Sequence, residues 1–328
     1  MSITHFPHGI SSMGVPVIGS QALMTQGNSF FVKPYSGSNS NDGQTPDTAV
    51  KTLAYALSLC TANQNDTVYM FAESNTGAST FEYLSSALTW NKDGVHLIGV
   101  NANPLVGIRS GIRNSLTATT IEDLFTVSAH NCLIANISVF QGDVTSTASA
   151  PRAMVVSGMR NRFFNCQISG NGDTGGSMDV AGARSLAVTG AENIFQHCYI
   201  GLNTVIRGTQ TTEVYVTTGA RNIFEDCVID SYTSLSTFKA FTAGAPDRFV
   251  MFKNCVFNAV QNITSAVAPT GAIASGSVNG SILVMGGGVF GYADVTTADD
   301  SKTLMLTYGA LAANIIDMGV AKGTDIAA

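Results

Sequence analysis

The sequence predicts an all-β fold, a right-handed parallel β-helix of three-strand coils of about 30 residues each, with a short N-terminal capping helix. Three observations predict it. A Phe-x-Asn-Cys-x-Ile segment recurs, its cysteines are spaced by 32, 29 and 28 residues, and the residues between them are largely β-branched, aromatic or turn-forming. The 33 glycines and 8 prolines suit frequent tight turns rather than a disordered chain.

Four copies of the repeat align on their cysteines. They read RNRFFNCQI (160–168), ENIFQHCYI (192–200), RNIFEDCVI (221–229) and RFVMFKNCVF (248–257), and a weaker copy reads NCLIANISV (131–139). Equivalent residues of stacked coils lie about 4.8 Å apart, so each column should form a ladder along the solenoid. The predicted ladders are Phe163, Phe195, Phe224 and Phe252; Asn165, His197, Asp226 and Asn254; and Cys166, Cys198, Cys227 and Cys255.

A bend between the Phe and Ile columns explains the repeat. The two columns are five residues apart, as in Phe163 and Ile168, so regular alternation would place them on opposite faces. The residues between them, such as Asn165 and Asp226, tolerate the left-handed conformation. A one-residue bend there lets both apolar columns point inward, where each side chain should contribute roughly 1.5 to 3 kcal/mol by burial.

The same stacking predicts reduced cysteines. Neighbouring thiols of a ladder point the same way, a geometry that fits a disulfide poorly. No CxxC or Cys/His pair with zinc spacing occurs. We therefore interpret the cysteines as small apolar core residues.

The ends of the chain differ from the repeat. Residues 1–28 read as an extended anchoring arm, and 29–66 as a strand followed by a capping helix over Thr48–Cys60. The β-helix should span 67–300, and 301–328 should hold C-terminal strands and a tail. The N-terminus lacks a basic leader and a long apolar run, so secretion through a signal peptide is not expected.

Charge and hydropathy exclude two classes of partner. The net charge is −6 and only 12% of residues are charged, with no basic run. Nucleic-acid binding is therefore not expected. No stretch of about 18 apolar residues occurs, so we expect no membrane insertion.

Two motifs carry a resemblance to a known family. The strand SFFVK, the turn GSNSNDGQTPDTA, a helix and then coils with F-x-N-C-x-I resemble the pectin-lyase-like β-helix proteins of tailed-phage virions. The opening THFPHGISSMGVPV resembles an arm of phage structural proteins. The resemblance implies the β-helix fold, but its members include lyases, hydrolases, tailspikes and capsid decorations.

The sequence shows no catalytic, cofactor or metal site. Glu225 and Lys253 share a column and are best interpreted as a surface ion pair rather than as an acid/base pair. Asn39, Asn41 and Asp42 resemble part of a calcium loop but lack its later glutamate, which favours a turn. Arg160, Arg221 and Arg248 recur ahead of the Phe column and should line one face.

The apolar arm, the low charge, the modest length and the absence of a catalytic cluster favour a non-enzymatic virion role. We expect a capsid decoration or cement protein, present in the phage particle and assembled in the host cytoplasm, as a homotrimer bound to the major capsid protein of the head. The alternative is a tailspike or tail fibre that binds or cleaves host surface polysaccharide. A third hypothesis is a pure glycan-binding module with Tyr199, Tyr215 and Tyr232 as exposed stacking platforms. The predicted partner-binding residues of the arm are Phe6, Pro7, Ile10, Met13, Val15, Pro16, Val17 and Ile18.

Overall fold

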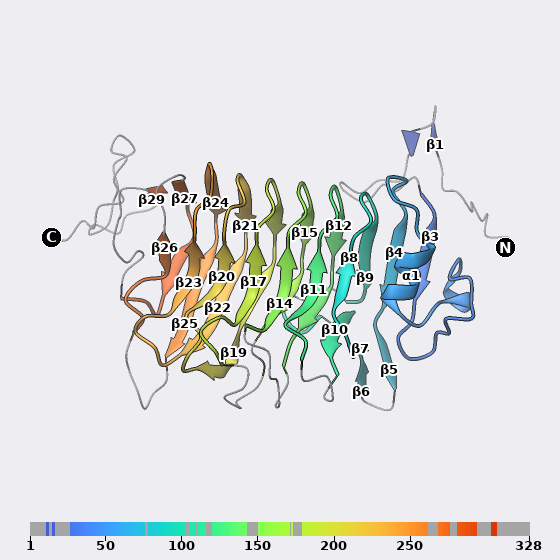
Figure 1. Ribbon diagram of the computed structural model, residues 1–328, viewed down its shortest axis with the longest axis horizontal. Coiled ribbons are helices and arrows are strands. Elements are labelled where there is room, and N and C mark those ends of the chain that lie inside the picture. The colour runs from blue at the N-terminus through green and yellow to red at the C-terminus, as the bar shows by residue number, and fades with distance from the viewer. Residues whose placement is uncertain are drawn as a thin grey trace.

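The computed structural model is an elongated solenoid with the N-terminal coils at one end and the C-terminal coils at the other (Figure 1). It describes residues 11–12, 15–16, 27–75, 78–102, 105–108, 110–115, 120–142, 150–170, 172, 179–261, 268–275, 281–293 and 303–306. Three parallel sheets run along the solenoid, and each coil contributes one strand to each. No helix among these residues is long and apolar enough to cross a membrane.

The ten-stranded sheet contains the strands that carry the Phe ladder. Its order is β29 (Thr303–Leu306), β27 (Ser281–Met285), β24 (Phe249–Lys253), β21 (Asn222–Glu225), β18 (Ile194–Gln196), β15 (Arg162–Phe164), β12 (Leu133–Ala135), β9 (His96–Val100), β4 (Thr67–Phe71) and β3 (Ser29–Val32).

The eight-stranded sheet carries the Ile ladder. Its order is β28 (Gly288–Phe290), β25 (Val256–Gln261), β22 (Val228–Thr233), β19 (Tyr199–Arg207), β16 (Gln167–Ser169), β13 (Ser138–Phe140), β10 (Gly111–Asn114) and β7 (Glu82–Leu84).

The seven-stranded sheet completes each coil. Its order is β26 (Ile273–Ser275), β23 (Lys239–Ala243), β20 (Thr212–Val216), β17 (Arg184–Val188), β14 (Arg152–Val156), β11 (Asp123–Val127) and β8 (Leu88–Trp90). Two short antiparallel pairs lie outside the sheets, β1 (Ser11–Ser12) with β2 (Val15–Pro16) and β5 (Glu73–Asn75) with β6 (Ala78–Thr80).

Two of the three corners of the coil have constant length. From β12 onward, two residues join the ten-stranded to the eight-stranded sheet, as Asn165 and Cys166 do between β15 and β16; we call this the short corner. Five residues join each strand of the seven-stranded sheet to the next strand of the ten-stranded sheet, as 157–161 do; we call this the middle corner. Between the eight-stranded and seven-stranded sheets the connection ranges from three to fourteen residues, and we call this the variable corner.

The interior is a set of stacked apolar columns. Phe163 and Phe195 stack with their ring centroids 4.6 Å apart and their planes 7° apart, and Phe195 and Phe224 repeat this at 4.7 Å and 8°. Phe252 continues the column at 4.9 Å, and all four rings are fully buried. Such ring pairs add about 0.5 to 1.5 kcal/mol each beyond the burial of area.

The short corner turns on one residue with a positive φ. The φ values are 59° at Asn136, 48° at Asn165, 53° at His197, 51° at Asp226 and 52° at Asn254. A buried, free cysteine follows each of the last four bends, whereas Ile137 follows Asn136, and each of these four thiols donates to a carbonyl of the preceding coil. The Sγ–O distances are 3.4 Å for Cys166 to Ile134, 3.6 Å for Cys198 to Phe163, 3.3 Å for Cys227 to Phe195 and 3.4 Å for Cys255 to Phe224.

The middle corner is held by a buried asparagine ladder. Asn161, Asn193 and Asn222 are at most 1% exposed. The Oδ1 of Asn193 accepts the backbone N–H of Asn161 at 3.0 Å, and the Oδ1 of Asn222 accepts that of Asn193 at 2.9 Å. The Nδ2 of Asn193 donates to the Gly158 carbonyl at 3.1 Å. The ladder therefore satisfies backbone groups that the turns leave unpaired.

The N-terminal end is closed by α1 (Leu53–Leu59), which is shorter than the predicted helix over residues 48–60. Residues 46–48 form a 3-10 turn, η1 (Pro46–Thr48), and Val50 pairs with the backbone of β3. The helix consequently begins only after Thr52, whose Oγ1 accepts the backbone N–H of Tyr55 at 3.3 Å. Leu53, Ala56 and Leu57 are buried at the end of the core.

A carboxyl group lies beneath this helix. Glu82 occupies the column that Ile112, Val139 and Ile168 fill in later coils, and it is 6% exposed. Its two oxygens lie 3.1 and 2.9 Å from the backbone N–H of Leu53. Burial raises the pKa of Glu82 to about 7, and the Leu53 N–H opposes this shift.

Replacement of one ladder asparagine should destabilise the fold. Asn193→Ala leaves the Asn161 N–H and the Gly158 carbonyl without their buried partners, so we expect the free energy of unfolding to fall by about 2 kcal/mol. Urea denaturation followed by circular dichroism measures this change. Thr218→Ala, an exposed position near the same corner, should change it by less than about 0.5 kcal/mol. Equal effects of the two variants would contradict a stabilising ladder.

The Glu82 carboxyl should make stability depend on pH. Its folded pKa of about 7 lies above the ordinary value of 4.5, so the folded state holds the proton more tightly and loses stability as the pH rises from 4.5 to 7. The full loss is about 3 kcal/mol. Glu82→Gln removes this loss, so its stability relative to the parent should rise with pH over that window. Parallel pH profiles from denaturation at each pH would contradict this assignment.

Candidate functional site

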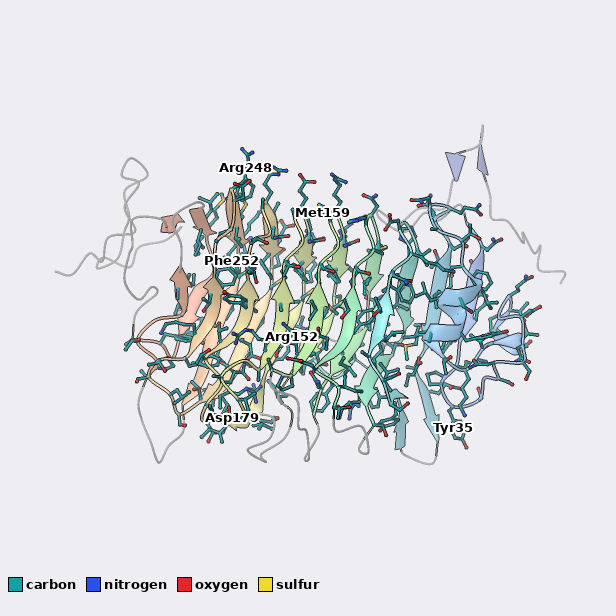
Figure 2. The ribbon with its side chains drawn as sticks, in the orientation of Figure 1. Tyr35, Arg152, Met159, Asp179, Arg248 and Phe252 are labelled. Carbon is teal, nitrogen blue, oxygen red and sulfur yellow. The ribbon has the colours of Figure 1, made fainter. Side chains whose placement is uncertain are left out.

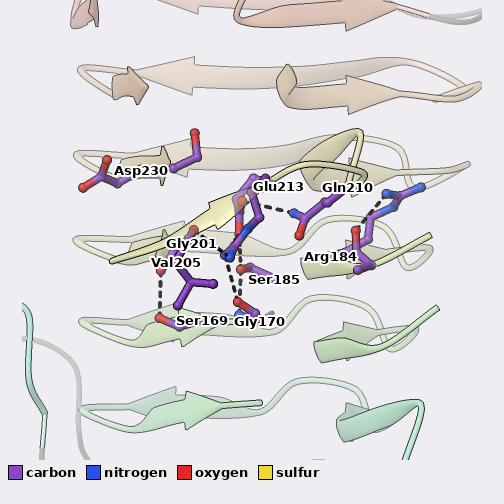
Figure 3. Close-up of polar contacts among 12 residues, drawn as sticks. Ser169, Gly170, Arg184, Ser185, Gly201, Val205, Gln210, Glu213 and Asp230 are labelled. Atoms are coloured by element: carbon purple, nitrogen blue, oxygen red, sulfur yellow. Dashed lines mark hydrogen bonds and ion pairs between the residues drawn. The ribbon is translucent and has the colours of Figure 1, made fainter. Parts of the chain in front are cut away.

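The largest departure from the repeat lies at the variable corner. There β19 is nine residues long, and its pairing with β22 slips in register between Leu202 and Ile206. Only four residues then separate Arg207 from β20, whereas fourteen separate β16 from β17 in the preceding coil. Arg207, at the end of this irregular strand, joins polar side chains of β17, β20 and the connection before β20 in the buried charged network shown in Figure 3.

Arg207 and Glu213 form the centre of this network. Both side chains are fully buried, and Nη2 of Arg207 lies 3.9 Å from Oε1 of Glu213. The guanidinium also donates to the carbonyls of Val205 at 3.1 Å and Gly170 at 3.0 Å. Glu213 accepts hydrogen bonds from the Ser185 hydroxyl and, at 3.1 Å, from Nε2 of Gln210.

The register shows what these polar groups replace. Ser185 and Glu213 share one side-chain column with Leu124, Ala153 and Ala240 of other coils. All of these residues are buried, so two coils have a polar pair where the others have apolar side chains. Burial raises the pKa of Glu213, and nearby Arg207 opposes that shift. Burial likewise lowers the pKa of Arg207.

A second carboxylate, Asp230, is held beside the excursion of β19. It accepts the Tyr199 hydroxyl at 2.6 Å and the side-chain amides of Asn203 at 2.7 Å and Asn258 at 2.8 Å. Gly201 permits the close approach, because its φ is 108° and a Cβ there would lie 1.9 Å from the Asp230 carbonyl oxygen. Burial, followed by the hydrogen bond to Asp230, raises the pKa of Tyr199.

The prediction that Tyr199 is an exposed stacking platform is therefore wrong. Its ring is 7% exposed because its hydroxyl is tied to Asp230. Tyr215 and Tyr232 are half-buried, and the guanidinium of Arg184 lies 5.0 Å from the Tyr215 ring centroid. These three tyrosines do not form a common exposed surface.

The network contains carboxylates, a guanidinium and hydroxyls, which are groups that general acid–base chemistry uses. Glu213, Arg207, Gln210 and Ser185 are fully buried, however, and Asp230 is 4% exposed. A glycosidase carboxyl pair must flank a bound sugar, and this pair instead faces protein groups. In this arrangement the network joins neighbouring coils across an irregular corner.

Surface acids are paired along the coil axis. Glu192 lies between Arg160, at 2.8 Å, and Arg221, and the hydrogen bonds from Arg221 and Arg160 lower its pKa. Arg248 does not belong to this column, because Arg221 aligns with Phe249. Arg248 lies 3.5 Å from Asp247 and projects at the edge of the molecule (Figure 2), so the three arginines do not stack in a single column.

The turn before α1 is held by its own polar side chains. Asp42 accepts the Thr48 hydroxyl at 2.6 Å and the Gln44 N–H at 3.1 Å, and the Thr48 bond lowers its pKa. Oδ1 of Asn39 accepts the backbone N–H groups of Lys51 and Thr52. Within the described part of the chain, no group of three or more His, Cys, Asp or Glu side chains could hold a metal ion.

The predicted arm lies largely beyond the described residues. Phe6, Pro7, Ile10, Met13, Val17 and Ile18 fall outside them, and Val15 and Pro16 are described only as the backbone of β2.

The buried pair yields a double-variant test. Arg207→Met removes the positive charge and leaves Glu213 buried without it, so the free energy of unfolding should fall by about 3 to 5 kcal/mol. Adding Glu213→Gln should recover part of this loss, because the amide keeps an acceptor for Ser185 without the charge. Chemical denaturation of the four proteins gives the coupling energy. Simple additivity would contradict an energetic link between the two residues.

No protein family model and no curated protein matches the chain. Solved structures do match it. A pectin methylesterase variant in complex with a hexasaccharide is similar over 90% of this chain and 92% of its own, with a TM-score of 0.56 and 14% identity. The pectin methylesterase from Aspergillus niger, in a penultimately deglycosylated form, is similar over 94% and 90%, with a TM-score of 0.54 and 16% identity.

Another complex of a pectin methylesterase with a hexasaccharide gives a TM-score of 0.52 at 13% identity, over 90% of this chain and 92% of that chain. At such identities the likeness concerns the fold and not the chemistry. The chain thus has the pectin-lyase-like fold, a right-handed parallel β-helix with three sheets.

Proposed function

We propose that the chain is a structural protein of a phage particle, a capsid decoration or cement subunit that stabilises the head. Residues 1–28 serve as the arm that binds the major capsid protein. The proposal combines the resemblance of the N-terminal segments to phage structural proteins with the way in which the solenoid uses its charged side chains. An extended arm gains affinity from the area that it buries on a neighbouring subunit.

One observation supports a scaffold over a hydrolase. Many carboxylates in the described part of the coils accept hydrogen bonds from backbone or side-chain donors of the same chain, or pair with its cations. Asp179, for example, accepts the backbone N–H groups of Gly208, Thr209 and Gln210. The others with such partners include Asp66, Asp93, Asp123, Glu192, Glu213, Glu225 and Asp230. Acids bound in this way stabilise coils and are poorly placed to transfer protons to a substrate.

The arm provides the test of this function. The full chain and a variant lacking residues 1–28 are each incubated with phage heads stripped of the protein, and bound protein is measured after sedimentation. We expect the full chain to bind and the truncated chain to remain in solution with an unchanged circular dichroism spectrum. Binding by the truncated chain would contradict anchoring through the arm, and failure of both to bind would contradict the capsid role.

A second function, glycan binding by a tailspike or tail fibre, is favoured by a different observation. Tyr83 on β7 and Phe290 on β28, the two end strands of the eight-stranded sheet, are 55% and 58% exposed. Exposed rings of this kind stack on sugar faces. Binding of host surface polysaccharide that is lost in Tyr83→Ala and Phe290→Ala, with no binding to heads, would favour this function over the capsid role.

A further inference from the structure

An apolar column runs along the outer face of the ten-stranded sheet. Ile194, Ile223, Met251 and Leu283 occupy equivalent positions on β18, β21, β24 and β27, and each points away from the Phe ladder. Ile194 is 36% exposed and the other three are half-buried. In a sheet with one buried face, the outward positions are ordinarily polar, so four successive apolar residues are unusual.

The neighbouring column of the same face carries opposite charges. Glu225 lies two residues after Ile223 on β21, and Lys253 lies two residues after Met251 on β24. Nζ of Lys253 lies 2.5 Å from Oε1 of Glu225, and the two side chains remain 47% and 23% exposed. The hydrogen bond from Lys253 thus leaves both charges accessible on the surface, one coil apart.

This pattern is complementary to itself. A two-fold axis parallel to the strands, midway between β21 and β24, reverses the coil order while it preserves the strand direction. It would place Glu225 of one copy opposite Lys253 of the other, and Ile223 opposite Met251. The apolar column would then cover itself, and four charges of alternating sign would meet beside it.

We propose that a second copy of this chain packs face to face on this surface, with the outer side of the ten-stranded sheet as a two-fold interface. Parallel sheets stacked at about 10 Å interdigitate such side chains. Two features favour a second copy of the chain as the partner. The two-fold axis places each negative charge of one copy opposite a positive charge of the other, and the apolar residues of both copies are spaced by the same distance between coils. In a trimer around an axis parallel to the long axis of the solenoid, identical residues of the three copies would instead lie at the same level along that axis. The sequence-based expectation of a trimer is replaced in this proposal by a dimer.

The interface is independent of the arm and of the proposed function, because it uses the coils alone. Charge-reversal variants test this interface. The oligomeric state of the full chain is measured by sedimentation velocity at micromolar concentration and low salt. The parent should sediment as a dimer. Glu225→Lys and Lys253→Glu should each weaken the dimer by at least about tenfold in dissociation constant, because each places like charges opposite one another.

Mixing provides the decisive measurement. An equimolar mixture of the Glu225→Lys and Lys253→Glu proteins should recover the dimer, because each reversed charge then meets an opposite one across the axis. A folding defect would not be rescued in this way. Lys51→Glu, an exposed change of the same kind near the capping helix, should leave the dimer unchanged.

Three results would overturn the proposal. These are a parent that sediments as a monomer under the conditions of this test, a parent that sediments as a trimer, and reversed variants that dimerise as strongly alone as when mixed.

Discussion

The fold depends on one backbone constraint, the left-handed residue at the short corner of every coil. Without it, the Phe and Ile columns five residues apart would point to opposite sides of a straight strand. With φ near 50° at Asn165, Asp226 and their equivalents, the phase of alternation is reset and both columns enter the core. The left-handed conformation costs an ordinary residue roughly 1 to 2 kcal/mol. Asparagine and aspartate adopt it more readily, which explains their recurrence there.

Polar residues fix the coil as much as apolar ones. The thiols hydrogen-bond to carbonyls of the preceding coil, and the asparagine ladder satisfies the turns of the middle corner. With these bonds, the short corner keeps a length of two residues and the middle corner a length of five, so only the variable corner differs in length between coils. The charged network of Arg207 and Glu213 lies at that corner, where the register of β19 slips. A buried ion pair of this kind is a consequence of the irregular strand rather than a source of large stability.

The sequence alone is sufficient to predict the fold class, because the repeat encodes a coil geometry that recurs in each turn. It also contains the signal for the asparagine ladder, since Asn161, Asn193 and Asn222 align two residues before the Phe column, but that column was not interpreted as buried. The candidate site could not be predicted in this way. Arg207 is buried where the register of β19 slips, and strict alternation along that strand carries no information about the slip. The burial of Tyr199 accompanies its hydrogen bond to Asp230 of the next coil, a contact that the alternation along a single strand does not show.

The unequal lengths at the variable corner have a consequence for protein engineering. Strands β16 and β17 are joined by fourteen residues and β19 and β20 by four, yet the strands on either side keep their parallel pairing with the coils above and below. The closure entropy of a longer loop rises only slowly with its length. This edge of the solenoid is therefore suited to carry grafted peptides, and several grafts would be displayed in a row at the spacing of successive coils.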